Sequence, residues 1–166
     1  MLCFYLDASA WTKRFTNELG GDTVSALLQT VAADEMASLY TSSVAIAETA
    51  AAVNRYRNRV NMPDSEFIAL INGILGDLNG VSRLPVLDSD YLDAIPLITR
   101  YHINSSDAVQ LHGILYRLTT ILSAQPSDII LVSSDSRFLR AARLTGLQTL
   151  DPTAFPLEAV PSLFEL

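Results

Sequence analysis

Short apolar runs alternate along the chain with longer stretches in which apolar residues recur every three or four positions. The short runs predict strands at residues 2–6, 38–41, 83–87, 129–132 and 147–150. The longer stretches predict helices at residues 11–15, 23–35, 44–59, 64–78, 89–101, 107–123 and 137–144. Strands that alternate with helices are typical of a parallel sheet covered on both faces. We therefore expect an α/β protein with three layers, α/β/α, around a central parallel sheet.

Particular residues add detail to this pattern. Ile129–Val132 is an unbroken apolar run, as expected of a strand covered by helices on both faces. Pro96 is expected to kink or interrupt the helix that contains it. Residues 153–166 show no clear period. We expect one domain at residues 1–152 and a C-terminal tail, 153–166, that packs on this domain or on a partner.

Composition favours one compact domain, because 49% of the 166 residues are hydrophobic and 17% are charged. No run is apolar and long enough to span a membrane. The N-terminus lacks the basic start and cleavage site of a signal peptide. Cys3 is the one cysteine, so no internal disulfide forms, and it is expected to be a small core residue. These features predict a cytoplasmic protein without a membrane partner.

Four acidic residues lie where a carboxylate is costly or well placed for chemistry. Asp7 and Asp135 follow predicted strands, so both are expected at the carboxyl edge of the sheet, where open α/β sheets bind ligands. Asp107 lies in the first turn of a predicted helix. Glu48 has valine and alanine as its helical neighbours, so we expect it on an apolar face. An unpaired charge there would be costly.

Each acid alone also has a purely structural explanation. Asp7 and Asp135 could cap the helices that follow them. Asp107 could complement a helix dipole, which contributes well under about 1 kcal/mol when exposed. Glu48 could pair with a buried arginine.

Taken together, the four acids favour a metal site. Several carboxylates within a few ångströms cannot all stay ionised unless a positive charge lies among them. An all-oxygen donor set without Cys or His suits Mg²⁺ or Mn²⁺. The two histidines, His102 and His112, are expected to be structural because they precede or lie within helices.

Four segments carry a further pattern: Tyr5-Leu6-Asp7-Ala8-Ser9-Ala10, Ser42-Ser43-Val44-Ala45-Ile46-Ala47-Glu48, Ser105-Ser106-Asp107-Ala108-Val109-Gln110-Leu111 and Val132-Ser133-Ser134-Asp135-Ser136-Arg137-Phe138-Leu139-Arg140-Ala141-Ala142. In this order and spacing the chain resembles the PIN-domain ribonucleases, and among them the VapC-type toxins of bacterial type II toxin–antitoxin pairs. The chain departs from many members in having Ser136 and Arg137 where a further acid or amide follows the fourth acid.

The resemblance implies a PIN-like fold and a divalent-metal-dependent endoribonuclease. Its catalytic and metal-binding acids would be Asp7, Glu48, Asp107 and Asp135, with Ser9 and Ser106 beside them. The implied cofactor is Mg²⁺ or Mn²⁺. The implied reaction is hydrolysis of an RNA phosphodiester bond by a water that the metal activates, giving a 5′-phosphate and a 3′-hydroxyl. The implied partners are an RNA substrate, a small antitoxin whose tail fills the crevice, and a second copy of the chain. Trp11 and Phe15 could contact that second copy, and packing in the core is their alternative role.

The net charge of −7 argues against a generic nucleic-acid binder, so RNA contact must depend on local basic groups. The residues expected to reach RNA phosphates are Lys13, Arg14, Arg137 and Arg140. Surface ion pairs are the alternative role for these residues. Arg55, Arg57 and Arg59 are expected to meet a partner instead.

Other functions remain open at this stage. The chain could be a solitary PIN-domain enzyme of RNA processing, or a non-catalytic PIN-like module that binds protein. A metal-dependent phosphotransfer domain is a further alternative. However, a phosphatase of the haloacid dehalogenase kind needs a second aspartate two residues after the first, where this chain has Ser9. The acid pair that a phosphoryl receiver needs near its first strand is absent too.

Overall fold

The computed structural model describes residues 2–164, in which five parallel strands form one sheet in the order β3-β2-β1-β4-β5. The strands are β1 (Leu2–Leu6), β2 (Ala37–Ser42), β3 (Ser82–Leu84), β4 (Ile129–Val132) and β5 (Gln148–Leu150). The central strand, β1, pairs with β2 on one side and β4 on the other. Leu6 lies opposite Val132, so β1 and β4 end side by side at the carboxyl edge.

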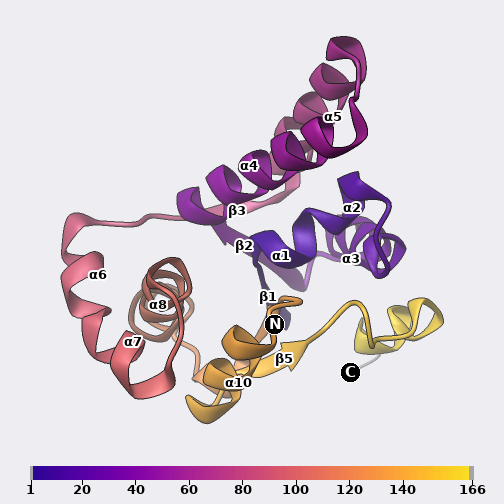
Figure 1. The fold of residues 1–166 in the computed structure, drawn as a ribbon. Helices are drawn as coiled ribbons and strands as arrows, with labels where there is room; N and C mark the ends of the chain where they lie inside the picture. The colour runs from indigo at the N-terminus through magenta and orange to yellow at the C-terminus, as the bar shows by residue number, and fades with distance from the viewer. Residues whose placement is uncertain (1, 165–166) are drawn as a thin grey trace.

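Helices cover both faces of this sheet, which confirms the predicted three-layer α/β/α fold (Figure 1). They are α1 (Ala8–Trp11), α2 (Lys13–Thr16), α3 (Gly21–Ala33), α4 (Ser43–Val60), α5 (Asp64–Asp77), α6 (Asp88–Asp93), α7 (Ile95–Tyr101), α8 (Ser105–His112), α9 (Thr119–Leu122) and α10 (Ser136–Leu144). Within residues 2–164, no helix is long and apolar enough to cross a membrane.

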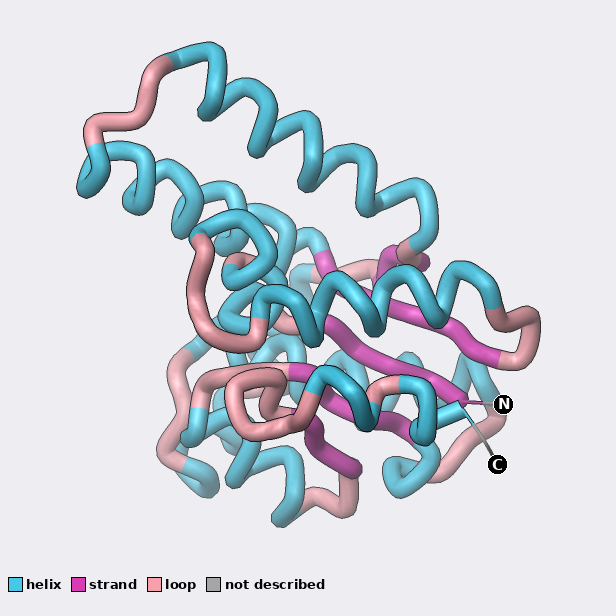
Figure 2. The backbone as a smooth tube through the Cα atoms, turned by 90° about the vertical axis from the view of Figure 1, so that its right-hand side faces the viewer, coloured by secondary structure: helices cyan, strands magenta, loops and turns pink. Residues whose placement is uncertain are grey.

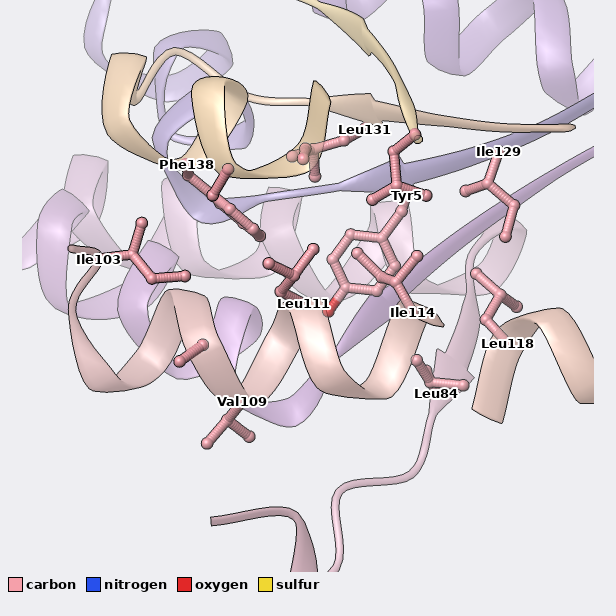
Figure 3. Close-up of a cluster of buried hydrophobic side chains, with 14 of the residues drawn as sticks. Tyr5, Leu84, Ile103, Val109, Leu111, Ile114, Leu118, Ile129, Leu131 and Phe138 are labelled. Carbon is pink, nitrogen blue, oxygen red and sulfur yellow. The ribbon is translucent and has the colours of Figure 1, made fainter. Parts of the chain in front are cut away.

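The alternation of side chains along β1 builds a separate core on each face of the sheet. Phe4 and Leu6 belong to the core that includes residues of α1, α3, α4 and α5. Cys3 and Tyr5 belong to the opposite core, with residues of α8 and α10. Figure 3 shows the Tyr5 ring between the sheet and the helical segment that carries Leu111 and Ile114. Cys3 is buried, as the sequence predicts.

The long helices α4 and α5 form a pair that projects from the sheet (Figures 1 and 2). The side chain of Ser42 caps α4 by accepting a hydrogen bond from the backbone N–H of Ala45, at 3.2 Å. This cap fixes the start of α4 at the carboxyl end of β2. The first turns of α4 therefore lie beside the end of the sheet.

The element boundaries differ from the sequence predictions where local chemistry intervenes. β3 ends at Leu84 instead of residue 87, because Pro85 has no N–H to donate to a neighbouring strand. The helix predicted over residues 89–101 is two helices, α6 and α7, which meet just before Pro96. The helix predicted over residues 107–123 contains a π-helical stretch, Gly113–Leu118, between α8 and α9.

The tail that follows residue 152 packs on the body of the domain as far as it is described. It contains two short 3₁₀ turns, Leu157–Ala159 and Pro161–Phe164. Val160 is buried, and the ring of Phe164 lies 5.6 Å from that of Phe4 between centroids. The last two residues of the tail, 165–166, lie outside the described residues.

Candidate active site

The four acids singled out in the sequence line one cavity of about 480 Å³ at the carboxyl edge of the sheet. Asp7 directly follows β1, and Asp135 lies just beyond β4. Glu48 comes from the second turn of α4, and Asp107 from the first turn of α8. Four elements that are far apart in the chain thus each contribute one carboxylate to the same space.

Asp7 is buried and tightly held. Its Oδ2 accepts hydrogen bonds from the Ser9 hydroxyl at 2.6 Å, the Ser133 hydroxyl at 2.9 Å and the Ser9 N–H at 3.1 Å. Its Oδ1 accepts a longer bond, 3.4 Å, from the side-chain amide of Gln110. Asp7 therefore caps α1, as its structural explanation predicts, and still lines the cavity.

Asp107 is buried, and its Oδ2 has no hydrogen-bond partner among residues 2–164. Burial, together with the charges of Asp7, Asp135 and Glu48, raises the pKa of this carboxyl to about 7. The Asn104 side chain caps α8 by accepting the Asp107 N–H at 2.8 Å. Near neutral pH, the folded chain thus holds a carboxyl that a nearby cation would stabilise in its charged form.

Glu48 is half-buried on the cavity wall beside Ala51 and Ala52. These helical neighbours are apolar, as the sequence predicts, and together with Glu48 they line the cavity. Burial raises the pKa of Glu48, the Ser106 hydroxyl lowers it, and the charge of Asp7 raises it.

Asp135 has a structural role as well as a place in the cavity. Its Oδ1 caps α10 by accepting the N–H groups of Arg137 and Phe138, at 2.8 and 3.1 Å. Its Oδ2 lies 3.8 Å from the Arg137 guanidinium. The Asp135 N–H donates to the Ser133 hydroxyl at 3.1 Å, which links this acid to the bonds around Asp7. Ser133 lies within the fourth sequence motif, but sequence reasoning did not select it.

Two basic side chains line the cavity, Lys13 and Arg55. Lys13 Nζ is 3.4 Å from Glu18. Arg55 makes no ion pair among the described residues, whereas Arg57 and Arg59 lie over aromatic rings. Sequence reasoning assigned all three arginines to a partner. The signal that separates Arg55 from the others is its position seven residues, or two helical turns, after Glu48 on the same helix.

The other predicted RNA contacts lie outside the cavity lining. The Nε of Arg14 is 3.1 Å from Asp77. A guanidinium nitrogen of Arg140 donates to the Tyr101 carbonyl at 2.6 Å. Arg137 is exposed next to Asp135. Of the four bases proposed from sequence to contact RNA, the structure brings one, Lys13, to the cavity.

The oxygen atoms of these acids are suitable ligands for a divalent metal ion, although the acids do not form a complete coordination sphere. Within residues 2–164, no set of three or more Asp, Glu, His or Cys side chains is arranged to hold a metal ion by itself. Mg²⁺ usually binds proteins through one or two carboxylates and keeps several waters. The carboxylate oxygens in the lining and the unpartnered oxygen of Asp107 fit such a partly hydrated ion.

The histidines lie away from the cavity lining. His102 ends α7 in a left-handed conformation, with φ of 53°. His112 Nδ1 is 3.3 Å from a carboxylate oxygen of the buried Asp90, which also binds Arg117. The contact with Asp90 agrees with the structural role expected of His112, whereas His102 is exposed.

The parallel sheet and its helical layers form a three-layer α/β/α fold, with the acids at the carboxyl edge of the sheet. Two solved structures with this fold are PAE2754 from Pyrobaculum aerophilum and VapBC2 from Rickettsia felis bound to a DNA fragment from their promoter. The first has a TM-score of 0.61 and 13% identity, covering 97% of this chain and 96% of that chain. The second has a TM-score of 0.54 and 12% identity, covering 90% of this chain and 98% of that chain.

These likenesses confirm the predicted PIN-like fold over nearly the whole chain. At such low identity they establish the fold and not the chemistry. No family model matches the sequence, and the curated proteins contain no match.

Proposed function

We propose that this protein is a divalent-metal-dependent endoribonuclease that hydrolyses RNA phosphodiester bonds and acts as the toxin of a toxin–antitoxin pair. The observation that supports this most is the cavity itself, which gathers the four acids singled out in the sequence, with Glu18 as a fifth, and contains an unpartnered, buried oxygen of Asp107. The likeness in fold to the VapBC2 protein supports the toxin assignment at the level of fold.

Asp7 and Asp107 would hold the ion most directly, because they are the most buried of the four acids. Asp7 directly follows β1 and Asp107 lies on α8, and both elements are fixed by core packing. Glu48 and Asp135 would complete its surroundings through water. A bound Mg²⁺ or Mn²⁺ supplies Lewis acidity toward the phosphate and lowers the pKa of water. Hydrolysis adds water across the bond between phosphorus and the 3′ oxygen, which gives the 5′-phosphate and 3′-hydroxyl ends.

Lys13 and Arg55 would bind the phosphates on either side of the one that is cleaved. They are the cations of the cavity, and the overall charge of −7 makes such local contacts necessary. With so few cations in place, we expect selective RNA binding whose affinity depends only shallowly on salt, because the slope scales with the number of phosphate contacts.

An antitoxin and a second copy of the chain are the proposed protein partners. The VapBC2 likeness supports the antitoxin. Trp11 is buried, and its Nε1 donates to Asp77 at 2.9 Å, so this side chain belongs to the core and does not contribute to a dimer contact. Phe15 is partly covered and packs against the same core.

The test is RNA cleavage by the purified protein with Mg²⁺ or Mn²⁺, with EDTA as the metal-free condition. Asp7→Asn and Asp107→Asn should each reduce the cleavage rate on the order of 100-fold or more, because metal catalysis supplies several kcal/mol of charge stabilisation. The 5′-phosphate ends of the products can be detected with a phosphate-dependent exonuclease.

Glu35→Gln is the matched control. Glu35 is an exposed acid in the turn between α3 and β2, at the opposite edge of the sheet. The Glu35→Gln variant should cleave RNA at the same rate as the wild type. Equal cleavage by wild type and Asp7→Asn, or undiminished cleavage in EDTA, would contradict the proposed nuclease. A wild type that binds RNA or antitoxin but never cleaves would support the non-catalytic alternative.

A further inference from the structure

Gln110 is a polar side chain in a place that helix packing would fill with an apolar one. It lies on α8 between Val109 and Leu111, both buried, and its own exposed fraction is 1%. Burying an amide without hydrogen bonds costs on the order of 1–3 kcal/mol. A buried amide at this position therefore calls for a specific set of partners.

Both ends of the Gln110 amide have partners, and both partners lie on or beside β1. Its Nε2 donates to Asp7 Oδ1 at 3.4 Å, and its Oε1 accepts the hydroxyl of Tyr5 at 3.2 Å. The contact with a carboxylate fixes the orientation of the amide, because the reverse orientation would place two acceptors against each other.

Tyr5 is buried below the cavity, and Figure 3 shows its ring between the sheet and α8. Its hydroxyl is thus held by core packing on both sides. The chain of contacts runs from this fixed phenol, through Gln110, to the one oxygen of Asp7 that the serines do not hold.

We infer that Tyr5 and Gln110 are positioning residues, which orient Asp7 Oδ1 toward a divalent cation in the cavity. The inference rests on the proposed function, since Asp7 acts there as a metal ligand. The 3.4 Å bond is long enough to leave Oδ1 open to an ion, while Ser9 and Ser133 hold Oδ2. Side chains that hold a ligand from behind typically contribute about 10–100-fold to metal affinity.

The test measures Mn²⁺ affinity by electron paramagnetic resonance or calorimetry, with no RNA present. Gln110→Met keeps the length of the side chain and removes both polar ends, and Tyr5→Phe removes only the hydroxyl. Each should weaken Mn²⁺ binding roughly 10-fold or more. Tyr40→Phe is the matched control on β2, because the Tyr40 side chain packs at the edge of the same core. It should leave the affinity unchanged.

Two combined variants separate positioning from general stability. Tyr5→Phe with Gln110→Met removes both partners of one hydrogen bond, so thermal stability should recover toward the wild type while Mn²⁺ affinity stays low. Gln110→Met in an Asp7→Asn background should cause no further loss of affinity, because its effect passes through Asp7.

The outcomes of these measurements distinguish the positioning role of Tyr5 and Gln110 from the proposed metal dependence. Unchanged Mn²⁺ affinity in Gln110→Met and Tyr5→Phe, together with a loss in Asp7→Asn, overturns this inference and leaves the proposed function standing. A recovery of affinity in the double variant in parallel with its stability also overturns it, because the role would then be structural. If the wild type binds no Mn²⁺, or Asp7→Asn binds it normally, both the proposed metal dependence and this inference are wrong.

Discussion

Asp107 combines two properties at the scale of one residue: a buried oxygen without a partner and a pKa raised from its ordinary value of 3.8 to about 7. A raised pKa means that the folded chain holds this proton more tightly than the unfolded chain does. The associated stability is fully present below pH 3.8 and is lost as the pH rises through about 7.

The metal-free protein should therefore lose stability between about pH 4 and about pH 7, inside this window. The measurement is the melting temperature in EDTA at a series of pH values. Asp107→Asn cannot ionise, so its melting temperature should fall less over the same range. Glu35→Gln should follow the wild type. An equal fall in wild type and Asp107→Asn would show that Asp107 is ionised normally.

Arg55 permits a prediction about substrate, because it lines the cavity and makes no ion pair among the described residues. Arg55→Ala should weaken the binding of a short RNA, measured in the inactive Asp7→Asn background. The slope of log affinity against log salt should become shallower by about 0.7 for a lost contact with single-stranded RNA. Arg59→Ala, whose guanidinium lies over the Tyr56 ring, is the control and should leave this slope unchanged.

At the scale of an element, the Ser42 hydroxyl determines where α4 begins and hence where Glu48 stands. Ser42 is fully buried, and it accepts the Ala45 N–H. Ser42→Ala should lower the free energy of unfolding by about 1 kcal/mol, the usual cost of a lost helix cap. Ser43→Ala, at an exposed neighbouring position, is the control. Equal stability of the two variants in urea unfolding would show that the cap does not hold α4.

Sequence patterns were sufficient to predict most elements, because each strand and helix carries its own period. The 2–6 and 129–132 strands have the predicted bounds, and the break near Pro96 follows from the chemistry of proline. The π-helical stretch at 113–118 could not be predicted, since its apolar spacing also suits an α-helix. It depends on tertiary packing, which a single-sequence pattern does not contain.

The parts of the site that follow from the order of strands and helices along the chain could be predicted from the sequence. Asp7 follows β1 and Asp135 follows β4. These two strands pair in parallel, so the topology brings both acids to the carboxyl edge of the sheet. Which arginines reach the cavity depends on helix rotation and on nearby partners. Thus Arg14 lies against Asp77 and Arg55 faces the cavity, against the prediction from sequence. Gln110 escaped notice because its role depends on contacts across 103 and 105 positions of the chain.

At the scale of the whole molecule, the four carboxylates repel one another in the folded chain, because the cations that line the same cavity, Lys13 and Arg55, are fewer. A divalent ion that binds only this state should stabilise the entire domain by mass action. At a Mg²⁺ concentration about 100-fold above its dissociation constant, the gain is about 2.7 kcal/mol. For a domain of this size, that corresponds to a rise in melting temperature of about 5–10 °C.

The measurement is a thermal melt at neutral pH with Mg²⁺, compared with NaCl at the same ionic strength. NaCl screens the net charge of −7 without entering the cavity specifically, so it should give a much smaller rise. Asp7→Asn should lose most of the Mg²⁺ effect, while Glu35→Gln removes the same single charge far from the cavity and should keep it. If NaCl and MgCl₂ raise the melting temperature equally, or if both variants respond alike, the ion acts on the whole surface and the carboxylates do not share a cation.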